Sequence, residues 1–208
     1  MSLVKSTQTQ IRLYAHPEDH VSHRVRLVLA HKKISHELKL ITSEDERLEE
    51  ISDINPYNKL PLMIDRDLVL FENRVMIDYV EERYRAIQLM PIDPIQRARL
   101  RQLAWRLETD WLKLADILLS HSDDMSEPER TQARSELSST LITAAPLFSQ
   151  NAYFFSDHFS LCDAILLPVL WRMPEMGIRL PLEHARPVYR YMKQHFESEI
   201  FKESIKEE

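Results

Sequence analysis

The sequence predicts an α/β domain followed by an all-helical domain, and the order of its hydrophobic patterns is the main reason. Strand-like and helix-like segments alternate as far as Tyr84, after which only helix-like segments follow. Such alternation is typical of a sheet covered by helices. A connection containing two prolines, residues 86–94, separates the two patterns. We therefore expect one domain over residues 1–85 and a second over residues 95–208.

The elements of the first half follow from apolar periodicity. Residues 11–14 alternate apolar and polar side chains, as a half-buried strand does. Ser43 and Glu46 have the spacing of a capping box, which begins a helix. The predicted elements are a strand at 11–14, a helix at 21–31, a strand at 35–41, a helix at 43–51, a hairpin of 61–64 with 68–70, and a helix at 72–84. Their order is βαβαββα.

The second half contains the signals of helix starts. Asp93 and Pro94 are a good N-cap and first helical residue. The long helix that they begin has apolar residues at helical spacing, namely Leu100, Leu103, Ala104, Leu107, Trp111, Leu114 and Leu118. Capping boxes at Ser126-x-x-Glu129 and Ser160-x-x-Asp163 predict two further helices, and residues 186–196 predict a last one.

Composition excludes several classes of function. The chain of 208 residues has a net charge of −6, whereas proteins that hold phosphate backbones carry a basic excess. Its single glycine, Gly177, excludes a glycine-rich phosphate loop. Its single cysteine, Cys162, excludes an internal disulfide, and we interpret it as a small buried hydrophobic residue. No apolar run of about 20 residues and no secretory leader is present, so we expect a cytoplasmic protein.

Three motifs resemble the glutathione transferases, and one of them, Ser160-x-x-Asp163, is similar to that family's buried N-capping box. Residues 55–61, Asn-Pro-x-x-Lys-Leu-Pro, are similar to that family's Asn-Pro-x-x-x-Val-Pro. The resemblance implies a cis bond before Pro61 and a backbone at Leu60 that faces the glutathione peptide. Glu72-Asn73 is similar to the family's Glu-Ser, where a helix start binds a carboxylate of glutathione. The fold that the resemblance implies is a thioredoxin-like βαβαββα domain with a helical domain after it.

Within that superfamily the chain resembles the stringent starvation protein A family. Residues 21–30, residues 82–84, Leu89-Met90-Pro91 and the helical-domain pattern from Phe155 to Pro174 carry the likeness. The family implies a dimer that binds RNA polymerase holoenzyme, including its sigma factor, and regulates transcription under stress without a cofactor or conjugating activity. A heterodimer with a related chain is the alternative assembly. The chain has Arg-Ala-Ile-Gln at residues 85–88, where well-known members have Pro-His-Pro.

The glutathione-type pocket should be vestigial. Alignment with cysteine-type transferases puts Asp19 at the position of the nucleophile. An ionised carboxylate repels a thiolate and has no proton to donate. The nearby hydroxyls of Tyr14 and Ser22 are either activators or structural residues. We predict no catalytic residue, and the alternative is a glutathione-dependent transferase or isomerase. The pocket residues are Tyr14, Asp19, Ser22, Leu60, Pro61, Glu72 and Asn73.

Three histidines close together in the sequence raise the question of a metal site. His16 and His20 have helical spacing, and His23 follows one turn later. The first strand should end near Ala15, however, which puts His16 in a loop. The helical spacing of His16 and His20 then does not place them on one helix face. We therefore expect solvated or helix-start histidines and no metal.

Two surfaces are candidate protein interfaces. The connection between the domains should contact polymerase, because its side chains are free of regular structure. Within it, Leu89 and Met90 could instead fill the space between the domains. Trp105, Leu112 and Leu119 recur every seven residues and are either a widened core face or a dimer interface across a two-fold axis. The predicted polymerase-binding residues are Tyr84, Arg85, Ala86, Ile87, Gln88, Leu89, Met90 and Pro91.

Overall fold

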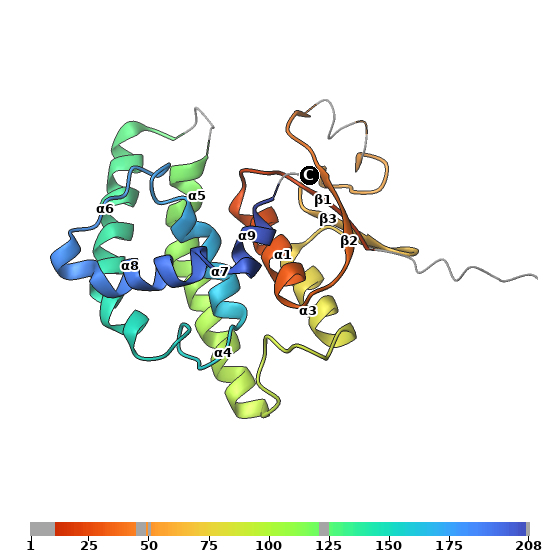
Figure 1. Ribbon diagram of the computed structural model, residues 1–208. Coiled ribbons are helices and arrows are strands. Elements are labelled where there is room, and N and C mark those ends of the chain that lie inside the picture. The colour runs from red at the N-terminus through yellow and green to blue at the C-terminus, as the bar shows by residue number, and fades with distance from the viewer. Residues whose placement is uncertain (1–10, 45–48, 50, 121–124, 207–208) are drawn as a thin grey trace, which may run out of the picture. The chain divides into compact units, whose positions relative to one another are not determined.

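The computed structural model describes residues 11–44, 49, 51–120 and 125–206 (Figure 1). The chain divides into two compact units. The first, here called the sheet unit, comprises residues 1–86 with residues 203–208, and the second, the helical unit, comprises residues 87–202. None of the described helices is long and apolar enough to cross a membrane.

The sheet unit contains a four-stranded mixed sheet. Its strands are β1 (Ile11–Ala15), β2 (His36–Leu40), β3 (Leu62–Asp65) and β4 (Leu68–Leu70), in the order β2-β1-β3-β4. β1 runs parallel to β2 and antiparallel to β3, and β3 pairs with β4 as a hairpin. Each strand lies within two residues of its predicted bounds, so this part of the fold prediction is confirmed.

Two helices of the sheet unit pack against each other: α1 (His20–His31) and α3 (Asn73–Arg83). The strands and both helices contribute side chains that are almost wholly buried; they include Leu13, Leu27, Leu29, Met63 and Met76. The helix predicted at 43–51 falls largely outside the described residues, because Glu46 of its capping box is among those left out.

A buried ion pair joins α1 to α3. The ammonium of Lys32 lies 2.6 Å from the carboxylate of Glu81, and their side chains are 0% and 8% exposed. Because both charges are desolvated, loss of either partner would leave the other uncompensated. The neighbouring His31 is affected as well: burial, with a smaller contribution from the charge of Lys32, lowers its pKa to about 4.

The helical unit consists of α4 (Pro94–Arg106), a π-helical turn (Leu107–Leu112), α5 (Lys113–Leu119), α6 (Glu127–Ala144), a 3-10 turn (Ala145–Ser149), α7 (Leu161–Trp171) and α8 (Leu182–Phe196). The helix starts predicted at Asp93, Ser126 and Ser160 are confirmed. Asp93 accepts a hydrogen bond from the Gln96 amide at 2.8 Å, and Glu129 accepts from the Ser126 amide at 2.8 Å. The fold is therefore a thioredoxin-like domain with a helical domain, as the motifs imply.

The capping box at the start of α7 is buried. The Asp163 carboxylate accepts hydrogen bonds from the amide and hydroxyl of Ser160, from the amide of Phe154 and, at 2.6 Å, from the hydroxyl of Tyr191. Burial raises the pKa of Asp163, and the donated hydrogen bonds oppose that rise. This one side chain thus links the helix start to the preceding loop and to α8.

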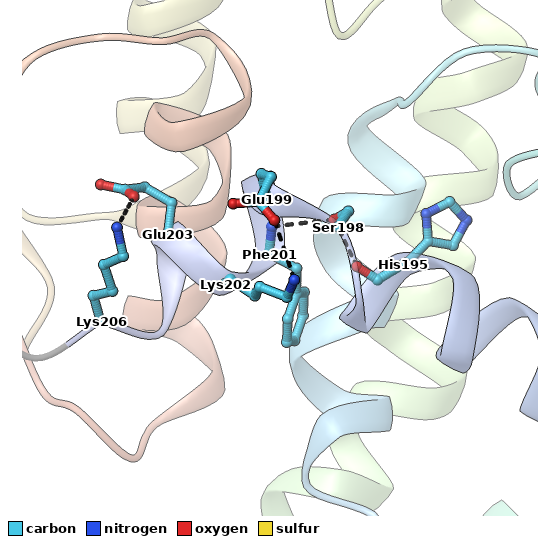
Figure 2. A network of polar contacts seen from close by, with 7 residues as sticks. All are labelled: His195, Ser198, Glu199, Phe201, Lys202, Glu203 and Lys206. Carbon is cyan, nitrogen blue, oxygen red and sulfur yellow. Dashed lines mark hydrogen bonds and ion pairs between the residues drawn. The ribbon is translucent and has the colours of Figure 1, made fainter.

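Three features of the helical unit differ from the predictions. The long helix from Pro94 is interrupted by the π-helical turn, which rotates the residues that follow it. α8 begins at Leu182 and is kinked at Ala185, two residues before Pro187. A short helix, α9 (Glu199–Ser204), was not predicted. At its start the hydroxyl of Ser198 donates to the carbonyl of His195 and accepts from the amide of Phe201 (Figure 2).

Candidate functional site

The start of α1 is occupied by the carboxylate of Asp19. Its Oδ1 accepts hydrogen bonds from the amides of Val21 at 2.6 Å and Ser22 at 2.7 Å. Its Oδ2 accepts from the hydroxyl of Ser22 at 2.5 Å. A helix start offers free amides and a partial positive charge to an anion. Here the chain's own carboxylate takes both.

Neither nearby hydroxyl is placed as a thiol activator would be. Ser22 is fully buried, and its hydroxyl donates to Asp19 while accepting from the amide of His16 at 3.0 Å. Tyr14 is 9% exposed and belongs to an apolar cluster with Ile41, Ile51, Leu62 and Ile64. These positions favour the structural interpretation of both residues.

Two of the three histidines near α1, His16 and His23, make separate local contacts. His16 follows the end of β1, and its Nδ1 accepts a hydrogen bond from the amide of Glu18 at 3.2 Å. The Nε2 of His23 lies 3.0 Å from the hydroxyl of Ser204. Within the described part of the chain, no three histidine, cysteine, aspartate or glutamate side chains are placed to hold a metal ion.

The loop before β3 has the conformation that the transferase motif implies. The Leu60–Pro61 peptide bond is cis, and β3 begins directly after it. Asn55 holds the loop: its side-chain amide donates to the carbonyl of Lys59 at 2.7 Å, and its oxygen accepts from the amide of Tyr57 at 3.0 Å. The cis bond that the motif implies before Pro61 is thus confirmed.

The start of α3 is capped in the same way as that of α1. Glu72 accepts a hydrogen bond from the amide of Val75 at 3.0 Å through Oε2, and from the side chain of Asn73 at 3.0 Å through Oε1. Arg24 of α1 donates to the oxygen of Asn73 at 3.1 Å. The transferase motif implies that this helix start binds a carboxylate of glutathione. Here, as at the start of α1, a carboxylate of the chain itself lies there.

The predicted polymerase-facing segment, residues 84–91, has neither helix nor strand. Arg85, Ala86 and Gln88 are exposed, whereas Leu89 is 2% and Met90 6% exposed. The segment therefore presents Arg85, Ala86 and Gln88 to solvent, while Tyr84, Ile87 and Pro91 are half-buried. The burial of Leu89 and Met90 favours the alternative interpretation of these two residues as structural.

A hydrogen-bonded group fixes the point where this segment leaves α3. The hydroxyl of Tyr79 donates to Asp65 at 2.8 Å and accepts from Arg83 at 2.7 Å. Burial and the acceptor Asp65 raise the pKa of Tyr79, so its hydroxyl keeps its proton. The guanidinium of Arg83 also lies over the ring of Tyr84, 5.5 Å from its centre. The first residue of the segment is thereby held while Arg85 points to solvent.

The heptad stripe on the long helix is not one surface. Trp105 is 50% exposed, but Leu112 is 5% exposed and lies in the core of the helical unit. Leu119 is half-buried. The π-helical turn between Trp105 and Leu112 is the reason, because it changes the angle between residues seven apart. The burial of Leu112 favours the widened core face for that residue over a subunit contact.

Comparisons with known proteins agree with this geometry. Residues 20–83 match the family model of the glutathione S-transferase N-terminal domain, and residues 109–199 match that of its C-terminal domain. Among solved structures, poplar glutathione transferase F1 superposes with a TM-score of 0.79 at 20% identity and covers 95% of this chain and 97% of its own, which shows the fold.

Proteins of closer sequence narrow the assignment. A stringent starvation protein A homologue of Coxiella burnetii is 37% identical over 94% of this chain and 91% of its own length. A second such homologue, of Histophilus somni, is 33% identical over 100% and 95%. The chain therefore belongs to the stringent starvation protein A family, within the glutathione transferase superfamily.

Proposed function

We propose that the protein binds RNA polymerase holoenzyme, including its sigma factor, through protein–protein contacts and regulates transcription under starvation or stress without catalysis. Its family supports this role. One observation of the structure supports the proposed absence of catalysis. The helix start that would stabilise a glutathione thiolate holds the carboxylate of Asp19, bound by two amides and a hydroxyl.

The electrostatics of that position oppose thiol activation. A thiolate placed where Asp19 lies would meet a second negative charge, which raises the pKa of the thiol instead of lowering it. The one hydroxyl beside it, that of Ser22, already gives its proton to the carboxylate. A thiol here would thus gain neither the helix-start amides nor a hydroxyl proton.

The exposed part of residues 84–91, here called the linker, supports a protein-binding role. Arg85 and Gln88 are exposed, and Arg85 is anchored by a 2.9 Å hydrogen bond from its Nε to the carbonyl of Glu82. Arginine is among the residues most enriched in interface hot spots. The net charge of −6 favours a protein partner over direct contact with nucleic acid. We expect the protein to act in the cytoplasm and as a homodimer, or as a heterodimer with a related chain.

Capture of purified holoenzyme by the tagged protein tests the proposal. The double variant Arg85→Glu with Gln88→Ala should weaken capture by about tenfold, as expected for loss of a hot-spot contact. Arg186→Glu, an exposed arginine of α8, is the control and should leave capture unchanged. Failure of the parent protein to capture holoenzyme contradicts the proposal, and an unaffected double variant moves the contact away from the linker.

A glutathione-dependent transferase or isomerase is the second candidate. The Asn-Pro-x-x-Lys-Leu-Pro and Glu72-Asn73 motifs support it, because the glutathione transferases use similar motifs at their glutathione site. Turnover of an electrophile by the purified protein with glutathione would decide for this candidate.

A further inference from the structure

A groove of about 660 Å³ lies in the helical unit beside the linker. It is bounded by residues 88–91, by one face of α4 from residue 96 to residue 106, and by residues 155, 156 and 158–160 of a loop. All of these residues belong to the helical unit, so the groove is formed within one compact body.

The floor of the groove is apolar. Leu89 and Phe159 are 2% and 7% exposed there, and Leu103 is half-buried beside them. Phe155 stands at the edge with 44% of its surface exposed, and its φ of 57° places it in a turn closed by the bridge of Tyr153 with Ser156. An exposed phenylalanine beside an apolar floor is a typical site for an inserted aliphatic or aromatic side chain.

The rim of the groove is basic. Arg99 and Arg106 of α4 and His158 of the loop line it, and no aspartate or glutamate is among the described residues that do so. Arg106 makes one contact with Asp110 at 3.7 Å, in which both side chains are mostly exposed. Such an exposed ion pair contributes little, so Arg106 can exchange it for a partner's carboxylate.

We propose that this groove receives an acidic segment of RNA polymerase holoenzyme that inserts a leucine or phenylalanine between Leu103 and Phe155 while its carboxylates pair with Arg99 and Arg106. The inference rests on the proposed function and names the chemistry of the partner. Gln88 belongs both to the groove and to the exposed part of the linker, so the two surfaces are continuous. The phosphates of a nucleic-acid strand would complement the basic rim. They would make no favourable contact with the apolar floor, however.

Charge reversal on the rim tests the electrostatic half of the proposal. Arg99→Glu with Arg106→Glu should weaken capture of purified holoenzyme by about tenfold or more at low salt, because like charges would then oppose each other. Arg101→Glu is the matched control: it is an exposed arginine on the same helix that does not line the groove, and capture should stay within about twofold. The neutral pair Arg99→Gln with Arg106→Gln should show a smaller loss, and circular dichroism checks that each variant folds.

Photocrosslinking tests the position of the occupant. Replacement of Phe155 by p-benzoylphenylalanine should yield a crosslink to purified holoenzyme in a segment rich in aspartate and glutamate. The same replacement of Trp171, which is 42% exposed and lies outside the groove, should yield none.

The outcomes separate this inference from the proposed function. If holoenzyme is captured but position 155 forms no crosslink, or the charge reversal leaves capture unchanged, the groove is not the docking site and the proposed function stands. A crosslink to nucleic acid or to a basic segment likewise overturns the inference. If the parent protein captures no holoenzyme, the proposed function and the inference fall together.

Discussion

The hydroxyl of Ser22 donates a hydrogen bond to the carboxylate of Asp19 at 2.5 Å, within the first turn of α1. The same carboxylate accepts hydrogen bonds from two backbone amides of that turn. The arrangement converts a helix start that could hold an external anion into a cap that is satisfied within the chain. One side chain thus satisfies two amides and a hydroxyl at this helix start.

Conjugating activity should be absent from the purified protein. With glutathione and an electrophilic acceptor at neutral pH, the rate should equal that of the uncatalysed reaction, because the position for the thiolate is taken by a like charge. The measurement is the appearance of the conjugate by absorbance. Turnover that disappears in Tyr14→Phe or Ser22→Ala would establish the enzymatic alternative.

Removal of the Asp19 cap should destabilise the sheet unit. Asp19→Ala leaves two amides of α1 without this acceptor, at a cost of about 1–2 kcal/mol in the free energy of unfolding. Urea denaturation followed by circular dichroism measures the loss. Asp19→Asn, which keeps an acceptor oxygen, is the control and should lose less. Equal stability of Asp19→Ala and the parent would contradict the structural role.

Local signals explain why much of this structure could be predicted from sequence. Apolar alternation located the strands, and the acceptors at Asp93, Ser126 and Ser160 located three helix starts. Each depends on residues at most three apart in the chain. The motif around Pro61 likewise predicted the cis bond.

Features that depend on tertiary packing could not be predicted. No residue type in the sequence marks the π-helical turn. The seven-residue spacing of Trp105 and Leu112 therefore gave no sign that only one of them is exposed. The groove is formed by three separate segments, and no one of them shows it alone. One missed feature did have a signal: Ser198 precedes Glu199 and caps α9, as serine often does.

Stability should fall with acid between about pH 6.5 and pH 4, the window set by His31. Burial lowers the pKa of His31 to about 4 and lowers that of His195 as well, whereas both are near 6.5 in the unfolded chain. The unfolded chain therefore binds more protons in this window, and stability is lost as the pH falls. The free energy of unfolding measured by urea at several pH values should vary less in His31→Gln than in the parent. A parallel pH profile for this variant would contradict the role of His31.

The buried group around Asp163 should act as a unit. Asp163→Ala removes the acceptor of four hydrogen bonds in a buried site and should cost about 3–5 kcal/mol. Tyr191→Phe removes one donor and should cost about 1–3 kcal/mol. Because the two residues share a hydrogen bond of 2.6 Å, their effects should not add in the double variant. Additive losses in urea denaturation would show that the pair is not coupled.

Dimerisation should depend on Trp105 and not on Leu112. If the α4 face forms a two-fold interface, a glutamate at Trp105 meets its own symmetry copy, and like charges oppose association. Trp105→Glu should therefore be monomeric by analytical ultracentrifugation with an unchanged circular dichroism spectrum, while Trp105→Phe stays dimeric. Leu182→Glu, at a residue 60% exposed on α8, is the control for an added surface charge.

Leu112→Glu should behave differently, because it buries an unpaired carboxylate in the helical unit at a cost of several kcal/mol and should lower the melting temperature. A parent that sediments as a monomer, or a Trp105→Glu variant that stays dimeric, would remove this face as the interface. A folded, monomeric Leu112→Glu would instead restore the surface that the heptad predicted.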